Sequence, residues 1–297
     1  MKPKRKASAL RHRISASARW HQKDSIALNL AVETYRAHEQ ATIRQLSAIL
    51  DGKTAGHHLA VNANINKDTA VQLAASGGLT PAKPGLPLRW QGQLTELSAT
   101  GDIPVRLLAP AALAASTTLF SLNDAALSIS SGSVRIEQLH WTPSSWKTRG
   151  DFTGIALLLP DTPAHAKDAP LQLGGRWQFD ASTQLTGELH IQRERGDWTL
   201  PGDVPQRLGL QQLQLQATAR HGSLSGQFAL NSEALGSVQA EVALMLPKKT
   251  QWSTAKELPL QGNIHATLTS LKWLNASGNN LRADGELRIQ AGIHGTL

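Results

Sequence analysis

The sequence predicts an all-β fold, in which an antiparallel sheet has one apolar and one polar face. Residues 208–244 alternate apolar and polar side chains in three segments, separated by short turns at His221-Gly222 and Leu235-Gly236. A period of two places alternate side chains on opposite faces of a strand. Aromatic residues make up only 4% of the chain, which favours a smooth aliphatic face over a thick sandwich core. We therefore expect an extended antiparallel sheet with a smooth aliphatic face.

The same alternation recurs along the chain. Residues 26–32 (IALNLAV) and 59–65 predict strands, and 71–75 predicts the partner strand after a turn at 66–68. Residues 34–50 are ambiguous, because their apolar side chains fit a helix at 3–4 spacing whereas the neighbouring segments favour strands. From Trp90 onward, strand-like pieces follow one another at short intervals to the last residues.

Two segments are expected. Residues 1–23 predict a basic arm that is disordered or partly helical, and residues 24–297 predict a β-rich region. The polar, proline-rich residues 160–170 predict a loop or a soft boundary within it. The chain of 297 residues is long enough for one large or two ordinary domains.

The positive charge is concentrated at one end. Seven of the 30 basic residues and none of the 22 acidic residues lie in the first twenty positions. Such an arm can bind nucleic acid or an anionic membrane surface. The alternative is a disordered segment at the start of the chain with no partner. The remaining chain shows no basic stripe interleaved with aromatics, so we expect no nucleic-acid partner.

Several pieces share a short strand with a central glycine: WQGQLTEL, LTGELHIQ, LQGNIHATL and ADGELRIQ. Glycine permits turn or bulge geometry. The recurrence suggests a loose repeat, in which each strand pair buries its apolar face only against its neighbours.

Motifs for catalysis are incomplete. Residues 51–54 (DGKT) resemble the end of a phosphate-binding loop, but Ser47 stands where that motif requires glycine. Residues 222–226 (GSLSG) place Leu224 where a nucleophile elbow requires serine. The sequence therefore predicts a non-enzymatic protein that needs no cofactor.

Metal and acid–base sites are not indicated either. The chain has no cysteine, and His57 and His58 are adjacent, so on a strand they point to opposite faces. Four carboxylates form no recognisable acid–base pattern: Asp151, Glu188, Glu194 and Asp197. We expect no metal site.

Tryptophan is the commonest aromatic, with eight residues against four Phe and one Tyr. The simplest interpretation is packing at the rim of the aliphatic face. The alternative is that some tryptophans lie at a groove mouth, where one side of the ring is apolar and the other wet.

In the order of its pieces, the chain resembles the repeat region of the TamB/AsmA-like family, the inner-membrane subunits of the translocation and assembly module of Gram-negative bacteria. The resemblance covers about residues 24–297. It is carried by LDGKTAGHHLAVNANI, RWQGQLTELSATGDIPVRLLAPAALAAS, RIEQLHWTPSSWKTRGDFTGIALLL, LQLGGRWQFDASTQLTGELHIQRERGDWTL, LQLQATARHGSLSGQFALNSEALGSVQAEVAL, LPLQGNIHATLTSLKWL and LRADGELRIQAGIHGTL.

The resemblance implies an elongated, twisted antiparallel β-sheet curled into an open groove with an apolar interior, anchored in the inner membrane and reaching across the periplasm of the cell envelope. It implies phospholipid acyl chains as cargo and an outer-membrane barrel of the BamA/TamA type as partner, with roles in lipid transport and outer-membrane protein assembly. Burying apolar groups is worth about 0.8 kcal/mol per CH₂, so an apolar lining holds lipid without a specific ligand.

The alternation and the resemblance together predict the residues that line the lipid groove. They are Leu185, Leu189, Ile191, Leu213, Leu215, Leu224, Phe228, Leu230, Val238, Val242, Leu244, Ile264, Leu268, Leu287 and Ile289. We expect those from Leu213 to Leu244 to share one apolar face.

The chain departs from the family at both ends. It shows neither the membrane helix nor a signal peptide at the start, and it stops inside what resembles a repeat. We therefore expect an internal fragment, with the barrel partner contacted through regions outside this sequence.

Two other classes remain open. A β-sandwich or β-helical surface protein of the adhesin type would close its apolar face into a core. A β-sandwich glycan hydrolase would need two carboxylates facing a cleft.

Overall fold

The computed structural model describes residues 14–21, 25–37, 41–65, 68–80, 87–157, 170–200, 206–246, 258–271 and 283–296. These residues form two compact units, 1–128 and 129–297. The described residues are strands, turns and loops, so the all-β prediction is confirmed. Among them is no helix able to cross a membrane.

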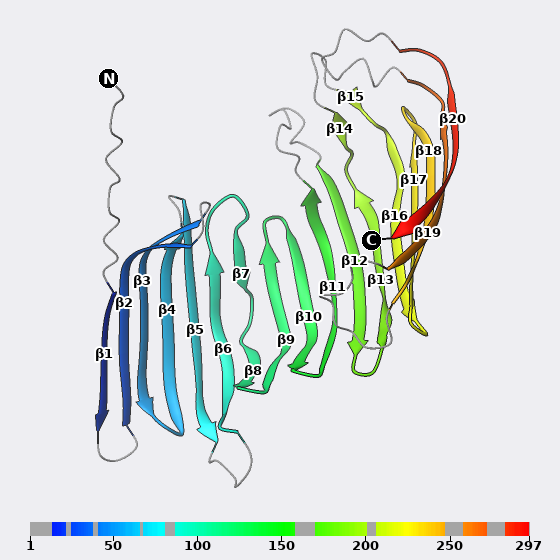
Figure 1. The fold of residues 1–297 in the computed structure, drawn as a ribbon. Helices are drawn as coiled ribbons and strands as arrows, with labels where there is room; N and C mark the ends of the chain where they lie inside the picture. The colour runs from blue at the N-terminus through cyan, green and yellow to red at the C-terminus, as the bar shows by residue number, and fades with distance from the viewer. Residues whose placement is uncertain are drawn as a thin grey trace, which may run out of the picture. The chain divides into compact units, whose positions relative to one another are not determined.

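Unit 1 is an antiparallel sheet of nine strands (Figure 1). They are β1 (Ile14–His21), β2 (Ser25–Ala37), β3 (Ala41–Lys53), β4 (Gly56–Ile65), β5 (Thr69–Thr80), β6 (Arg89–Ala99), β7 (Val105–Leu107), β8 (Ala111–Ser116) and β9 (Leu119–Ile129). From β1 to β6 each strand pairs with the next. Strands β7 and β8 both pair with β6, and β9 pairs with β8.

Unit 2 is also an antiparallel sheet. Its strands are β10 (Gly132–Thr142), β11 (Ser145–Leu157), β12 (Leu171–Ala181), β13 (Leu185–Arg195), β14 (Thr199–Leu200), β15 (Gln206–Arg207), β16 (Leu210–Arg220), β17 (Ser223–Ser232), β18 (Gly236–Met245), β19 (Pro259–Leu268) and β20 (Leu287–Thr296). The sheet runs in chain order from β10 to β20, except that β13 pairs with β16 and the short β14–β15 pair stands apart.

The turn between β16 and β17 shows how local sequence sets these hairpins. Arg220 pairs with Ser223, so only His221 and Gly222 lie between the strands, with φ of 53° and 75°. Two successive residues with positive φ match the twist of a two-residue hairpin. The predicted turn at His221-Gly222 is confirmed.

The structure differs from expectation in one N-terminal segment and decides an ambiguous one. Strand β1 lies within residues 1–23, where composition predicted a disordered or partly helical arm. Apolar residues alternate along β1 at Ile14, Ala16, Ala18 and Trp20. Each of them pairs with an apolar residue of β2. Of the ambiguous residues, 34–37 belong to β2 and 41–50 to β3, because cross-strand pairing outweighs a helical spacing that has no partner to pack against.

The division between units falls near residue 128, and not at the proline-rich stretch. Residues 160–169 of that stretch, predicted as a loop or a soft boundary, lie outside the described residues. The strands that flank it, β11 and β12, pair with each other inside unit 2.

Candidate functional site: the apolar face of unit 2

One face of the unit 2 sheet is apolar from strand to strand. Leu215 on β16 pairs with Phe228 on β17, which pairs with Ala240 on β18. Ala240 pairs in turn with Ile264 on β19. Residues paired across antiparallel strands share a face, so this row crosses the sheet on one side. We call this side the apolar face.

The register places all fifteen residues predicted to line a groove on the apolar face. Leu185, Leu230 and Leu268 are buried, and Leu215, Val242, Leu287 and Ile289 are exposed. The remaining eight are half-buried. Strict alternation therefore located the face, whereas the degree of exposure depends on what packs over each position.

The two strand ends of the apolar face are closed by small clusters. At one end Leu171, Leu208, Leu210 and Leu230 form a buried group, which we call the Leu171 cluster. At the other end Ala181, Leu185 and Ala219 form the Ala219 cluster, with Trp146, Phe179 and Leu224 packed against it. Along β16 the two clusters lie at opposite ends of the strand, at Leu210 and Ala219.

Between the clusters the apolar face is open. The side chains of Leu215 and Val242 are 36% and 40% exposed. Both residues lie in the middle of strands that are paired on both sides. We call this band the open middle. Its paired residues on β13 and β16–β20 carry no charged side chain. An exposed apolar band of this kind indicates a binding surface.

Aromatic side chains and glycines face each other where the apolar face crosses β11–β13. Gly150 pairs with Trp177, Gly175 with Phe152, and Gly187 with Phe179. A Cβ added at Gly175 would lie 2.7 Å from Phe152 Cζ, and one at Gly187 would lie 2.7 Å from Phe179 Cδ1. Each ring therefore covers the space over a glycine, which restores packing that glycine lacks. Sequence reasoning noted Gly187 in a glycine-centred strand but missed these pairs, because the pairing requires the register.

Asp197 secures the segment that covers the Leu171 cluster. Its carboxylate accepts hydrogen bonds from the backbone N–H groups of Trp198 (2.8 Å), Gly209 (2.8 Å) and Leu210 (3.0 Å). These bonds join both sides of the β14–β15 loop, and Trp198 packs against the cluster. Sequence analysis considered Asp197 only as an acid–base candidate; the structure assigns it a structural role.

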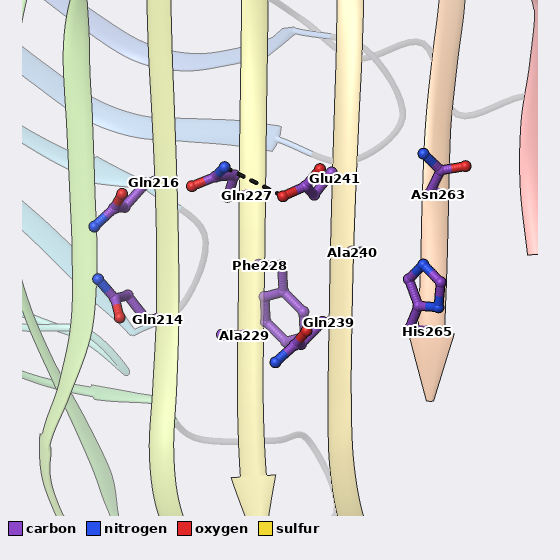
Figure 2. A pocket seen from close by; sticks show the side chains of 10 residues that line it. All are labelled: Gln214, Gln216, Gln227, Phe228, Ala229, Gln239, Ala240, Glu241, Asn263 and His265. Atoms are coloured by element: carbon purple, nitrogen blue, oxygen red, sulfur yellow. Dashed lines mark hydrogen bonds between the residues drawn. The ribbon is translucent and has the colours of Figure 1, made fainter. Parts of the chain in front are cut away.

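The opposite face of unit 2 is polar, and Figure 2 shows part of it. A hollow of about 440 Å³ lies over β16–β19, and the polar side chains that line it are Gln214, Gln216, Gln227, Gln239, Glu241, Asn263 and His265. The Gln227 amide donates to Glu241 at 3.3 Å, and the Gln214 amide lies 3.1 Å from His190 Nε2. This face carries polar, hydrogen-bonded side chains, whereas the open middle on the opposite face carries apolar ones.

Several charged groups of unit 2 also lie on the polar face. Lys147 Nζ lies 2.8 Å from Asp180 Oδ2, and this hydrogen-bonded ammonium holds the pKa of the Asp180 carboxyl below its usual value. Asp151 lies opposite Arg176 in the register of β11 and β12. Glu194 accepts a 2.7 Å hydrogen bond from the Gly154 backbone N–H. Asp151 and Glu188 lie on strands separated by β12.

In unit 1, His57 and His58 point to opposite faces, as predicted: His57 is buried and His58 is exposed. Both ring nitrogens of His57 are engaged. Nδ1 lies 3.0 Å from the Lys53 carbonyl, and Nε2 accepts a 2.8 Å hydrogen bond from Trp90 Nε1. Trp90 in turn lies over the paired glycines Gly77 and Gly92. Among the described residues there is no cluster of three or more His, Asp or Glu arranged to hold a metal ion.

No protein-family model, curated protein or solved structure matches this chain.

Proposed function

We propose that this chain is a segment of a TamB/AsmA-like protein and that the apolar face of unit 2 shields phospholipid acyl chains from water. In this proposal the protein acts without catalysis, on the periplasmic side of the cell envelope. The BamA/TamA-type barrel is its partner through regions outside the sequence.

The exposure of Leu215 and Val242 carries the proposal. A sandwich or adhesin-type fold would cover such residues with a second layer, whereas among the described residues of unit 2 the clusters close only the strand ends. Aliphatic side chains leave few specific contacts, so an acyl chain can move along the band without being held at one point.

The size of the open middle also fits lipid. Neighbouring strands are about 4.8 Å apart, so β13 and β16–β20 give the band a length of roughly 24 Å across the strands. Each leaflet of a bilayer holds about half of the roughly 30 Å hydrocarbon core. An acyl chain can therefore lie along the band with its full length in contact.

Lipid mass spectrometry on the full chain purified from a Gram-negative host tests the proposal. We expect phospholipid to co-purify with the parent and to be lost from a variant with Leu215→Asp, Phe228→Asp and Val242→Asp. The matched control carries Gln214→Asp, Gln227→Asp and Gln239→Asp on the same strands, β16, β17 and β18, but on the polar face. Equal lipid loss from both variants, or no lipid on the folded parent, would contradict the proposal.

A further inference from the structure

Two rows of side chains cross the hollow on the polar face of unit 2, as Figure 2 shows. Neighbours within a row come from adjacent strands, β16 to β19, so they repeat about every 4.8 Å. The two rows lie two residues apart along each strand, which is roughly 6.8 Å. The first row is Gln216, Gln227, Glu241 and Asn263, and the second is Gln214, Ala229, Gln239 and His265. We call this site the amide hollow.

Ala229 forms the low point of the amide hollow. Its methyl group stands between the longer side chains of Gln214 and Gln239, its partners on the two neighbouring strands. The hollow has a volume of about 440 Å³, within the range of about 300–1,000 Å³ that is typical of small-molecule sites. A ring-sized ligand therefore fits above Ala229 with polar side chains around it.

Some amides of the hollow are held by contacts within the protein. The Gln214 amide lies 3.1 Å from His190 Nε2, and the Gln227 amide donates to Glu241 at 3.3 Å. Such contacts orient these side chains before a ligand arrives, which lowers the cost of binding. Other amides are exposed and have no hydrogen-bond partner within the described part of the chain: Gln216, Gln239 and Asn263.

The lining of the hollow favours an uncharged ligand rich in hydroxyl groups. A side-chain amide both donates and accepts hydrogen bonds, and so does a hydroxyl group. Of the described residues, no lysine or arginine lines the hollow, so a phosphate or carboxylate ligand would have no such cation to pair with. An apolar ligand would leave the amides without partners.

A peptide main chain fits this site less well than a sugar. Extended peptides bind through the free backbone of a sheet edge. The backbones of β16 to β19 are already paired on both sides, so the hollow offers side chains only.

We propose that the amide hollow binds an uncharged, extended glycan that lies across β16–β19 between the two rows. One sugar ring of an extended glycan spans about one strand spacing, so successive rings meet successive strands. Their hydroxyl groups hydrogen-bond to side chains of both rows, and the C–H face of one ring lies on Ala229. Glu241 is the only carboxylate among the described residues that line the hollow. Glycoside hydrolysis uses a pair of carboxylates, so we assign binding without cleavage.

Titrating cellotetraose, a β-1,4-linked glucose tetramer, into the ¹⁵N-labelled full chain tests the proposal by NMR. The side-chain amide signals of Gln216, Gln239 and Asn263 should shift, while that of Gln72 in unit 1 should not. The matched tetramer of β-1,4-linked glucuronic acid carries a carboxylate on each sugar. It should bind about tenfold more weakly, because Glu241 repels it and no basic side chain offsets this.

Substitutions within the hollow test its position. Ala229→Leu should weaken cellotetraose binding by more than about tenfold, because the added side chain occupies the space of a sugar ring. The control Ser225→Leu places the same side chain on the same face of β17, outside the hollow, and should leave binding unchanged. Gln239→Leu should weaken binding roughly three- to tenfold, the effect of one lost hydrogen bond.

The glycan site does not depend on the proposed lipid role, because the two lie on opposite faces of the sheet. The variant with three aspartates on the polar face should lose cellotetraose and keep phospholipid, and the variant with three aspartates on the apolar face should do the reverse. The proposal would be overturned if cellotetraose did not shift the amides of the folded parent or if the charged tetramer bound equally well. Equal weakening by Ala229→Leu and Ser225→Leu, or equally tight binding of an uncharged polar tetrapeptide with blocked ends, would also overturn it.

Discussion

The ring of Trp177 occupies the space over Gly150, its direct partner across β11 and β12. A Cβ built on residue 150 would lie 2.5 Å from Trp177 Cζ2 and would also meet the Arg135 carbonyl oxygen. The indole N–H donates to Thr148 Oγ1 at 2.9 Å, which fixes the ring in this position. Glycine is therefore required at 150 by close packing.

Replacing Gly150 by alanine should destabilise unit 2. The added methyl group displaces either the indole or the neighbouring strand, and overpacking of this kind costs about 1–3 kcal/mol. Urea unfolding measures the change. Gly56→Ala is the control, because an added Cβ there meets nothing within 4 Å; equal destabilisation by both substitutions would contradict the packing argument.

Replacing Trp90 by phenylalanine should destabilise unit 1. His57 is 5% exposed, and its Nε2 loses its hydrogen-bond donor in this variant. A buried polar atom left without a partner costs about 1–3 kcal/mol. A double-mutant cycle with His57→Leu checks the cause: the Trp90→Phe penalty should shrink once His57 is absent, and an unchanged penalty would show that packing alone is responsible.

Replacing Asp197 by alanine should loosen the β14–β15 loop. Three backbone N–H groups lose a charged acceptor, and hydrogen bonds to charged groups contribute about 1.5–3 kcal/mol each. Hydrogen exchange should accelerate at Gly209 and Leu210 while the centres of β17 and β18 stay protected. Unchanged exchange at these amides would rule out the assigned role.

The Lys147–Asp180 pair should give a small pH dependence. The hydrogen bond from Lys147 lowers the Asp180 pKa from its ordinary 3.8, so the folded state binds this proton less readily than the unfolded state. The stabilisation is present above about pH 4 and disappears as the pH falls through the lowered pKa. Because the pair is exposed, its contribution is below about 1 kcal/mol.

Urea unfolding at pH 7 and pH 3, compared between the parent and Lys147→Gln, isolates this contribution. The acid-induced loss of stability should be smaller in the variant. An identical loss in both proteins would mean that other carboxyl groups account for the dependence.

Alternation was sufficient to predict the strands and faces of β16–β18, because Leu215 and Gln214 are neighbours in sequence and the period of two places them on opposite sides. It was insufficient for residues 34–50, where apolar spacing fits a helix equally well. The Gly150–Trp177 pair and the bonds from Asp197 to Gly209 join residues distant in sequence, so they depend on register and loop path. The hairpin spacing alone does not specify these.

Site-specific photo-cross-linking tests most directly whether the open middle of the apolar face contacts phospholipid. A benzophenone side chain at Leu215, in the full chain expressed in a Gram-negative host, should cross-link to phospholipid on irradiation. The same side chain at Gln214, one residue away on the polar face, should not. Lipid adducts at Leu215 alone are the predicted result; equal adducts at both positions, or none at Leu215, would contradict it.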